Sequence, residues 1–158
     1  MYISLNTNQY DINNVIISEK TKNNIMTNGD FYRLYYSTED IILNGLHISF
    51  ELKNISIEKY FNKIKCIFDN NGYNNNTVYL LKNIEKRLLE RYRGINRECV
   101  YRIGEQLENK FIKIFDDNYI NIKRYKSIKF VLKVSGIWSS QNEFGLTFRF
   151  FLTPIIED

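Results

Sequence analysis

The fold is decided by two runs near the end of the chain, residues 127–138 (SIKFVLKVSGIW) and residues 144–152 (FGLTFRFFL). Five polar or small residues, SSQNE, separate the two runs. In both runs apolar residues recur at every second position, which is typical of β-strands that are buried on one face. The sequence therefore predicts an antiparallel hairpin.

The register of this hairpin follows if Trp138 lies opposite Phe144. The pairs on its apolar face are then Val134–Phe148, Leu132–Phe150 and Phe130–Leu152. A shift of one residue would turn every side chain to the other face, so an apolar face of this length fixes the register. Trp138 falls on the same inward face, where we expect it in the core or at the mouth of a barrel rather than stacked on a base.

The opposite face of the predicted hairpin carries cations. Lys133 lies directly across from Arg149, and Val131 lies across from Phe151, with Lys129 diagonal to that ring. Like charges that face each other on a sheet are destabilising by a few tenths of a kcal/mol to about 1 kcal/mol. A chain tolerates this cost more readily if a polyanion covers the face. The alternative is that two long, flexible side chains splay into water.

Composition is compatible with one domain spanning residues 1–158, since a chain of this length can bury a core without disulfides or metals. Hydrophobic residues make up 44% and aromatic residues 15% of the chain, which excludes a disordered protein. Alanine is absent and proline occurs once, whereas Asn, Ile, Lys and Tyr are abundant. This bias is typical of an AT-rich genome, such as that of a large DNA virus, a phage, a linear plasmid or a parasite.

Charge and cysteine content limit the possible partners. The net charge of +4 permits a nucleic-acid partner without requiring one. Cys66 and Cys99 lie far apart without metal-ligand spacing, so we expect reduced core thiols in an intracellular protein. The first residues lack the features of a signal peptide, and no apolar run approaches membrane-spanning length. We therefore expect no secretion, membrane contact, metal or cofactor.

The predicted elements are strands followed by one long helix and further strands. Leu81, Ile84 and Leu88 recur at helical spacing, which predicts a helix over residues 77–93 that Asn76 can cap and Gly94 can end. Residues 69–76 are expected to form a loop, and residues 55–68 and 105–115 fit either a helix or a strand. The strands are predicted at residues 2–5, 15–18, 31–37, 41–52, 99–103 and in the terminal hairpin.

This order predicts a mainly β, or α+β, fold. One helix among five or six strands is the pattern of an oligonucleotide-binding (OB) fold, a partly open Greek-key barrel. Gly45 inside a predicted strand fits the bend or bulge that such barrels use to curl.

No catalytic motif is present in the sequence. His47 is the single histidine and lies in a predicted strand, where a structural or surface role is expected. No nucleophile–base pair, HExxH, CxxC or phosphate-binding loop occurs. We therefore expect a protein that is not an enzyme. One rival remains, an enzyme subunit whose active site forms only in a complex.

Single-stranded nucleic acid requires cations along the phosphate path and flat side chains on which bases stack. The predicted strand faces supply both, and Phe151 is the best ring because its phase exposes it. The alternative is that most rings lie in the core and the cations are simply solvated. The candidate binding residues are Arg33 and Tyr35; Lys63 and Lys65; Lys123, Arg124 and Tyr125 in a loop that also holds Lys126; and Lys129, Lys133, Arg149 and Phe151 in the hairpin.

Residues 132–150, LKVSGIWSSQNEFGLTFRF, resemble the carboxy-terminal barrel strands of single-stranded-DNA-binding proteins from large nucleocytoplasmic DNA viruses and cytoplasmic linear plasmids. Those proteins are similar to phage single-strand binders with an OB fold and an acidic tail. The shared pattern is a lysine-bearing strand, Gly-Ile-Trp, a short polar loop and Gly-hydrophobic-Thr-aromatic. The matching residues are Lys133, Gly136, Ile137, Trp138, Gly145, Leu146, Thr147 and Phe148.

The resemblance implies a replication accessory protein that coats unwound DNA strands at a replication site in the host cytoplasm. It covers about an eighth of the chain and implies no DNA contacts outside the hairpin. Replication enzymes would be further partners, and the oligomeric state stays open. Residues 154–158, PIIED, form a much shorter acidic end than the family's tail, so we expect an ordinary solvated end. The alternative function is a viral structural or assembly protein that uses its barrel to bind other proteins.

Overall fold

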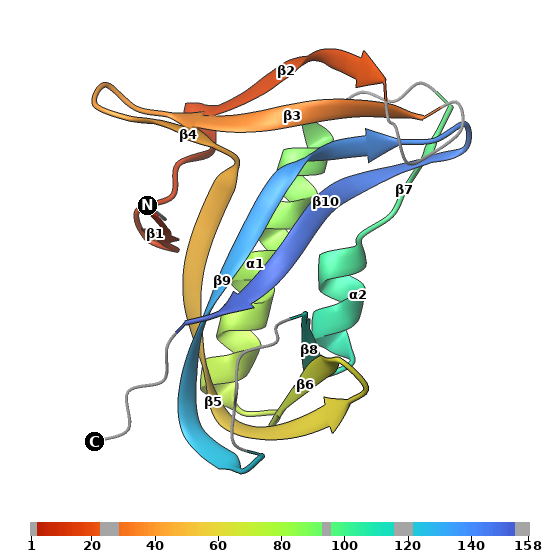
Figure 1. Ribbon diagram of the computed structural model, residues 1–158. Helices are drawn as coiled ribbons and strands as arrows, with labels where there is room; N and C mark the ends of the chain where they lie inside the picture. Colours follow the sequence, from red (N-terminus) through yellow and green to blue (C-terminus); the bar gives the residue numbers. More distant parts are fainter. Residues whose placement is uncertain (1–2, 23–28, 93–95, 116–121, 154–158) are drawn as a thin grey trace.

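The computed structural model describes residues 3–22, 29–92, 96–115 and 122–153. It is mainly β, with one ten-stranded sheet and two α-helices (Figure 1). The elements in chain order are β1 (Leu5–Asn6), a 3-10 turn (Ile12–Asn14), β2 (Val15–Lys22), β3 (Asp30–Ser37), β4 (Ile42–Asn44), β5 (Leu46–Tyr60), β6 (Lys63–Phe68), α1 (Gly72–Glu90), β7 (Glu98–Cys99), α2 (Arg102–Glu108), β8 (Phe111–Ile114), β9 (Arg124–Ser139) and β10 (Glu143–Leu152).

Strand β9 organises the sheet. One of its edges pairs with β5 as far as Val134 and with β3 from Gly136 onward, while the other edge pairs with β10. β6 adds to the far edge of β5, and β8 adds to β6, all antiparallel. The long β5 curves around the molecule (Figure 1), and the alternation of its buried residues changes phase at Asn54, whose φ is 56°. The mainly β prediction is confirmed.

The predicted register of the β9–β10 hairpin is confirmed for its lower part and wrong at its turn. Phe148 pairs with Val134 and Arg149 with Lys133, as expected. Between Thr147 and Phe148 the register shifts by one residue, so that Trp138 pairs with Gly145 instead of Phe144. Ser135 is the unpaired residue of this bulge, which an alternation pattern does not reveal because a bulge adds a residue to one strand only. Trp138 therefore lies on the face opposite to the predicted one.

The core lies between the sheet and the two helices. Figure 1 shows α1 behind β9 and β10, with α2 beside it. We call the sheet face that supplies the core the inner face, and the opposite one the outer face. Burying each of these apolar side chains stabilises the fold by about 1.5–3 kcal/mol. Inner-face residues and helix residues in this core include Leu46, Ile48, Phe50, Leu52, Phe130, Leu132, Val134 and Phe150 with Leu81, Leu88, Ile103 and Leu107.

The predicted long helix is present, but its predicted start is wrong. α1 begins at Gly72, inside the segment expected to be a loop, and its N-cap is Asn71 rather than Asn76. The side chain of Asn71 accepts a hydrogen bond from the backbone N–H of Asn74 at 2.9 Å, which satisfies one of the free donors of the first turn. The predicted end at Gly94 lies outside the described residues. The structure also contains a second helix, α2, where one inserted helix was expected.

Asn74 closes a gap in the sheet edge, since β5 pairs with β1 at Ser49 and with β6 only from Ile55. Its buried amide accepts from the N–H of Lys53 at 2.8 Å and donates to the carbonyl of the same residue at 2.8 Å. The amide also donates to the carbonyl of Asp69 at 2.9 Å. One side chain thus satisfies both backbone groups of Lys53, in the stretch of β5 between its pairings with β1 and β6.

Asn74→Ala is expected to lower the free energy of unfolding by about 2 kcal/mol, because the N–H and C=O of Lys53 lose their partners in a buried place. Urea unfolding measures this loss. Asn75→Ala is the matched control, since the side chain of Asn75 is exposed and, among the described residues, is hydrogen-bonded to Lys110 alone, at 3.5 Å. Equal stability of the two variants would contradict the role given to Asn74.

Candidate nucleic-acid interface

The outer face of the central strands brings four predicted hairpin residues together. His47 of β5, Lys133 of β9 and Arg149 of β10 form one row across the sheet, because Lys133 is the register partner of both others. The next row contains Phe151, which pairs with Val131 and is 38% exposed. Lys129 is exposed at the third row, where its β5 partner is Glu51. The predicted like-charge pair and exposed ring are therefore present on one face.

His47 lies beside Lys133 in this row. Burial, together with the charge of Lys133, lowers the pKa of His47 below its usual value, although a hydrogen bond with the backbone of Gly45 acts in the opposite direction. The imidazole is therefore neutral at pH 7. Its Nδ1 is buried without a hydrogen-bond partner.

A second group of cations and rings lies at the lower end of the sheet in Figure 1, on the outer faces of β6 and β8. We call this group, which consists of Lys63, Lys65, Phe111, Lys113 and Phe115 together with Arg149 and Phe151, the lower cluster. Lys63 and Lys65 alternate with buried residues along β6, and Phe111, Lys113 and Phe115 do so along and just beyond β8. The register places Lys65 opposite Lys113, a second pair of like charges.

Contacts connect the lower cluster into two groups, one around Phe111 and one around Phe115. The Nζ of Lys65 lies 4.7 Å and that of Lys113 5.4 Å from the ring centre of Phe111. The Nζ of Lys63 lies 4.8 Å from the ring centre of Phe115, whose carbonyl oxygen accepts a hydrogen bond of 2.7 Å from Arg149. The guanidinium carbon of Arg149 lies 5.1 Å from the ring centre of Phe151.

Sequence reasoning missed the three members of this cluster that come from β8. Residues 111–115 read FIKIF, a period-two pattern that predicts a strand with Phe111, Lys113 and Phe115 on one face. The competing helical pattern of residues 105–110 hid this signal. The structure resolves the conflict, since α2 ends at Glu108 and β8 begins at Phe111.

Arg33 and Tyr35 lie at the upper end of the sheet in Figure 1, on β3. Arg33 is exposed and donates a hydrogen bond to the side-chain oxygen of Asn44 at 3.1 Å, and its guanidinium carbon lies 5.8 Å from the ring centre of Phe31. Tyr35 is half-buried. The aromatic partner of Arg33 is therefore Phe31 rather than Tyr35.

The expected binding loop at residues 123–126 is not a stacking surface. Tyr125 is only 9% exposed and belongs to the core, which leaves little of its ring accessible to a base. Arg124 forms an ion pair with Asp69 at 3.0 Å, and the Nζ of Lys123 lies 5.0 Å from the ring centre of Tyr125. The change of burial phase near the bend of β9 turns Tyr125 inward, which the alternation of the preceding hairpin could not predict.

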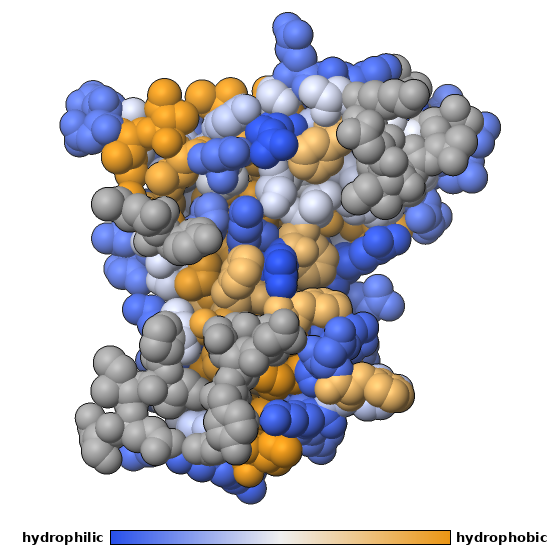
Figure 2. Space-filling model, viewed as in Figure 1, coloured by the Kyte–Doolittle hydropathy of each residue, from blue (hydrophilic) through white to orange (hydrophobic). Residues whose placement is uncertain are grey.

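Cations outnumber carboxylates on the outer face of β5, β6, β8 and β9 and on the lower part of β10. Figure 2 shows that hydrophilic and hydrophobic residues lie intermingled over β9 and β10. Two of these cations have an acidic register partner on β5: Glu51 lies opposite Lys129, and Glu58 lies opposite Lys65. The cations on this part of the face are Lys63, Lys65, Lys113, Lys129, Lys133 and Arg149.

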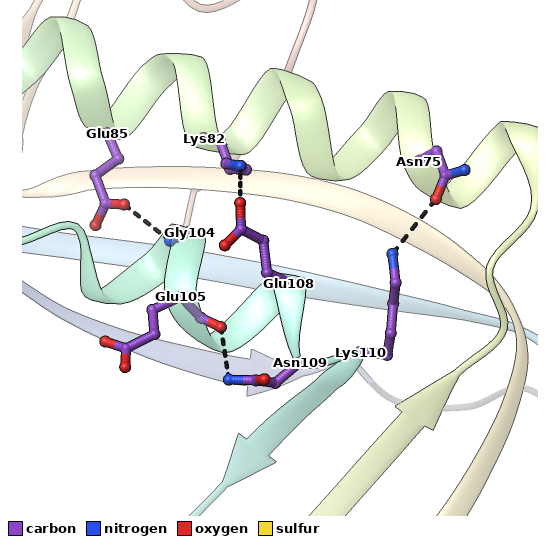
Figure 3. A network of polar contacts seen from close by, with 8 residues as sticks. All are labelled: Asn75, Lys82, Glu85, Gly104, Glu105, Glu108, Asn109 and Lys110. Carbon is purple, nitrogen blue, oxygen red and sulfur yellow. Dashed lines mark hydrogen bonds and ion pairs between the residues drawn. The ribbon is translucent and has the colours of Figure 1, made fainter.

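A cavity of about 690 Å³ with charged walls lies between α1 and α2. Its buried carboxylate, Glu85, accepts a hydrogen bond of 2.8 Å from the backbone N–H of Gly104 (Figure 3). It accepts another of 2.8 Å from the backbone N–H of Ile103. Burial raises the pKa of Glu85, against the effect of these N–H donors. Lys82 pairs with Glu108 across the same helices. These groups hold α2 onto α1. Glu85 also takes the place of an N-cap for α2, because Tyr101 at the N-cap position makes no side-chain hydrogen bond.

Within the described ranges, no group of three or more His, Cys, Asp or Glu residues is placed to hold a metal ion. In the same ranges, no helix has the length and apolar character needed to cross a membrane. The chain matches no protein-family model, no curated protein and no solved structure.

Proposed function

We propose that the outer face binds single-stranded DNA without sequence preference and that the protein coats unwound strands during replication or repair. The observation that supports this most is the series of cations and rings in the lower cluster, whose Arg149 also belongs to the row of Lys133. No catalysis, metal or cofactor is part of the proposal.

The chemistry of the series suits a flexible polyanion. Lysine and arginine side chains neutralise phosphates, and the exposed faces of Phe115 and Phe151 are flat surfaces for bases. Stacking is worth about 1–3 kcal/mol per base, and every base has a flat face, so such contacts tolerate any sequence. Two or three stacked bases with their phosphates account for much of a micromolar affinity.

We further propose that five of the strands, β5, β6, β8, β9 and β10, form a partly open barrel of the OB type. The antiparallel order β9-β5-β6-β8 supports this. β5, β6 and β8 are successive neighbours in this order, and β9, which follows them in the chain, returns to lie beside β5, as in a Greek key. The two helices lie between β6 and β8 in the chain, and the other five strands are additions to this arrangement.

The proposal is tested by titrating a labelled thymidine 20-mer into the protein at rising salt concentration and following fluorescence anisotropy. We expect binding at 50 mM salt that weakens steeply, because phosphate contacts release counterions. For single strands the logarithm of the association constant falls by about 0.7 per contact for each tenfold rise in salt. Six cations on the face allow a slope of up to about −4. Absence of binding at 50 mM salt would contradict the proposal.

A second candidate, a module for protein assembly, is favoured by the turn between β5 and β6. Phe61 is 89% exposed and Tyr60 65% exposed, and their rings contact each other with centres 4.9 Å apart. Phe61 also has a φ of 54°, a left-handed conformation that a bulky residue rarely adopts. If the purified protein self-associates through this turn and lacks affinity for the 20-mer, assembly becomes the better explanation. Phe61→Ser would then give monomers in light scattering.

A further inference from the structure

Two glycines on neighbouring strands allow two aromatic rings to lie against the outer face near its upper end. A Cβ on Gly136 of β9 would lie 2.5 Å from Cζ of Phe31. A Cβ on Gly145 of β10 would lie 3.0 Å from Cζ2 of Trp138. Each ring therefore packs directly on the backbone of a glycine, where a side chain would otherwise stand. Phe31 of β3 and Trp138 of β9 are register partners.

A guanidinium group lies over each ring. Arg33 covers Phe31, and the guanidinium carbon of Arg102 lies 4.7 Å from the ring centre of Trp138. Arginine stacks on aromatic faces because its group is planar, charged and weakly hydrated. Arg33 is also held by Asn44, but no hydrogen bond or ion pair to the described residues holds the exposed guanidinium of Arg102.

We propose that Arg102, supported from below by Trp138, is a stacking site for one nucleobase of a bound single strand. This proposal rests on the proposed function and adds a subsite to it. One plane of the guanidinium faces the indole, and the other plane is available to a base, since bases stack on arginine planes. The N–H donors at its edge remain available to a neighbouring phosphate. Trp138 is only 7% exposed, so the indole orients the arginine and does not itself meet the base.

The subsite lies on the same path as the lower cluster. Gly145, Thr147, Arg149 and Phe151 occupy alternate positions on the outer face of β10. Four residues of a strand span about 13 Å, so Gly145 and Arg149 lie within the reach of one short oligonucleotide. A DNA strand that lies along β10 would contact the lower cluster at one end and Arg102 at the other.

The test compares two ligands on wild type and Arg102→Lys, a thymidine 20-mer and a 20-mer of deoxyribose phosphate without bases. Lysine keeps the charge and removes the plane. We expect Arg102→Lys to weaken binding of the thymidine oligomer about tenfold, which corresponds to the lower end of the stacking range. Binding of the abasic oligomer is expected to change by less than twofold. Arg87→Lys, on the exposed side of α1, is the matched control and should leave both affinities unchanged.

A second variant tests the support from below. Trp138→Phe keeps a flat ring under Arg102 and is expected to retain most of the affinity for the thymidine oligomer, whereas Trp138→Leu should lose as much as Arg102→Lys. Equal losses for both oligomers in Arg102→Lys would make Arg102 a phosphate contact and overturn the stacking proposal, as would no loss for either. If wild type bound neither oligomer, the proposed function itself would fail, and this subsite with it.

Discussion

Reversing the charge of Lys133 or Arg149 is expected to remove most of the affinity for single-stranded DNA. At 50 mM salt one phosphate contact of a single strand contributes close to one power of ten, about eightfold, through counterion release. Each single reversal loses this contribution and adds repulsion, so we expect at least a tenfold loss for Lys133→Glu or Arg149→Glu and about a hundredfold loss for the double variant. Anisotropy titration with the thymidine 20-mer measures the change.

The same variants are expected to leave the fold intact. Each single reversal places opposite charges in register, where like charges stood before, and stabilises the pair by up to about 1 kcal/mol. Arg149→Glu also loses the hydrogen bond to the carbonyl of Phe115, which costs about as much. Lys133→Glu is therefore the cleaner variant. Lys86→Glu, on the exposed side of α1, makes the same change in net charge and should alter binding by less than threefold at the same salt.

The comparison decides between a defined face and a general attraction of positive protein for DNA. If Lys86→Glu weakens binding as much as Lys133→Glu, net charge alone explains the affinity and the outer face has no special role. If Lys133→Glu unfolds, its role is structural. Either result would contradict the proposed interface.

Gly136→Ala is expected to lower the free energy of unfolding by about 3 kcal/mol, at the upper end of the cost of overpacking. The added Cβ would lie 2.3 Å from the carbonyl oxygen of Tyr32, a backbone atom that cannot rotate away, and 2.5 Å from Phe31. β3 would have to move away from β9 at the point where the two strands pair. Urea unfolding monitored by circular dichroism measures the loss.

Gly72→Ala is the matched control, because the same methyl group added at the first residue of α1 meets nothing within 4 Å. Alanine reduces the freedom of the unfolded chain, so this variant should gain about 0.4–1 kcal/mol. The two substitutions should thus have opposite signs. A Gly136→Ala protein as stable as wild type would show that β3 does not pack on β9 as closely as described.

The strand pairs of the hairpin could be predicted because alternation is a local property. Leu132, Val134, Phe148 and Phe150 form one apolar face whatever the rest of the chain does. The bulge at Ser135 could not be predicted in the same way, since it arises where β9 changes partner from β5 to β3. That change depends on a strand about a hundred residues earlier in the chain.

The helices show the same limit. Leu81, Ile84 and Leu88 predict α1 by their spacing, but its start depends on Asn74 reaching the backbone of Lys53. The asparagine-rich segment has a composition typical of loops, and a tertiary contact outweighs this tendency. α2 is only seven residues long and is capped by Glu85 from another helix, a partner that no local motif reveals.

The sequence could predict the kinds of side chain in the candidate interface, but only some of the individual residues. Lys133, Arg149 and Phe151 share a face because they lie on one hairpin. Lys63 and Lys65 join them only through β8, whose position beside β6 follows from topology. Tyr125 was misplaced because the phase of β9 changes between it and Ile128, and the basic composition of its neighbours gives no information about that change.

The bulge at Ser135 has one practical consequence for solution work. It places the chain's one tryptophan on the side of the sheet that carries Arg149, directly beneath a guanidinium. Emission from this indole is sensitive to its immediate neighbours, so occupancy of the upper sheet can be followed optically on unlabelled, unmodified protein. A spectrum that never changes while a ligand saturates would show that the ligand stays clear of that end.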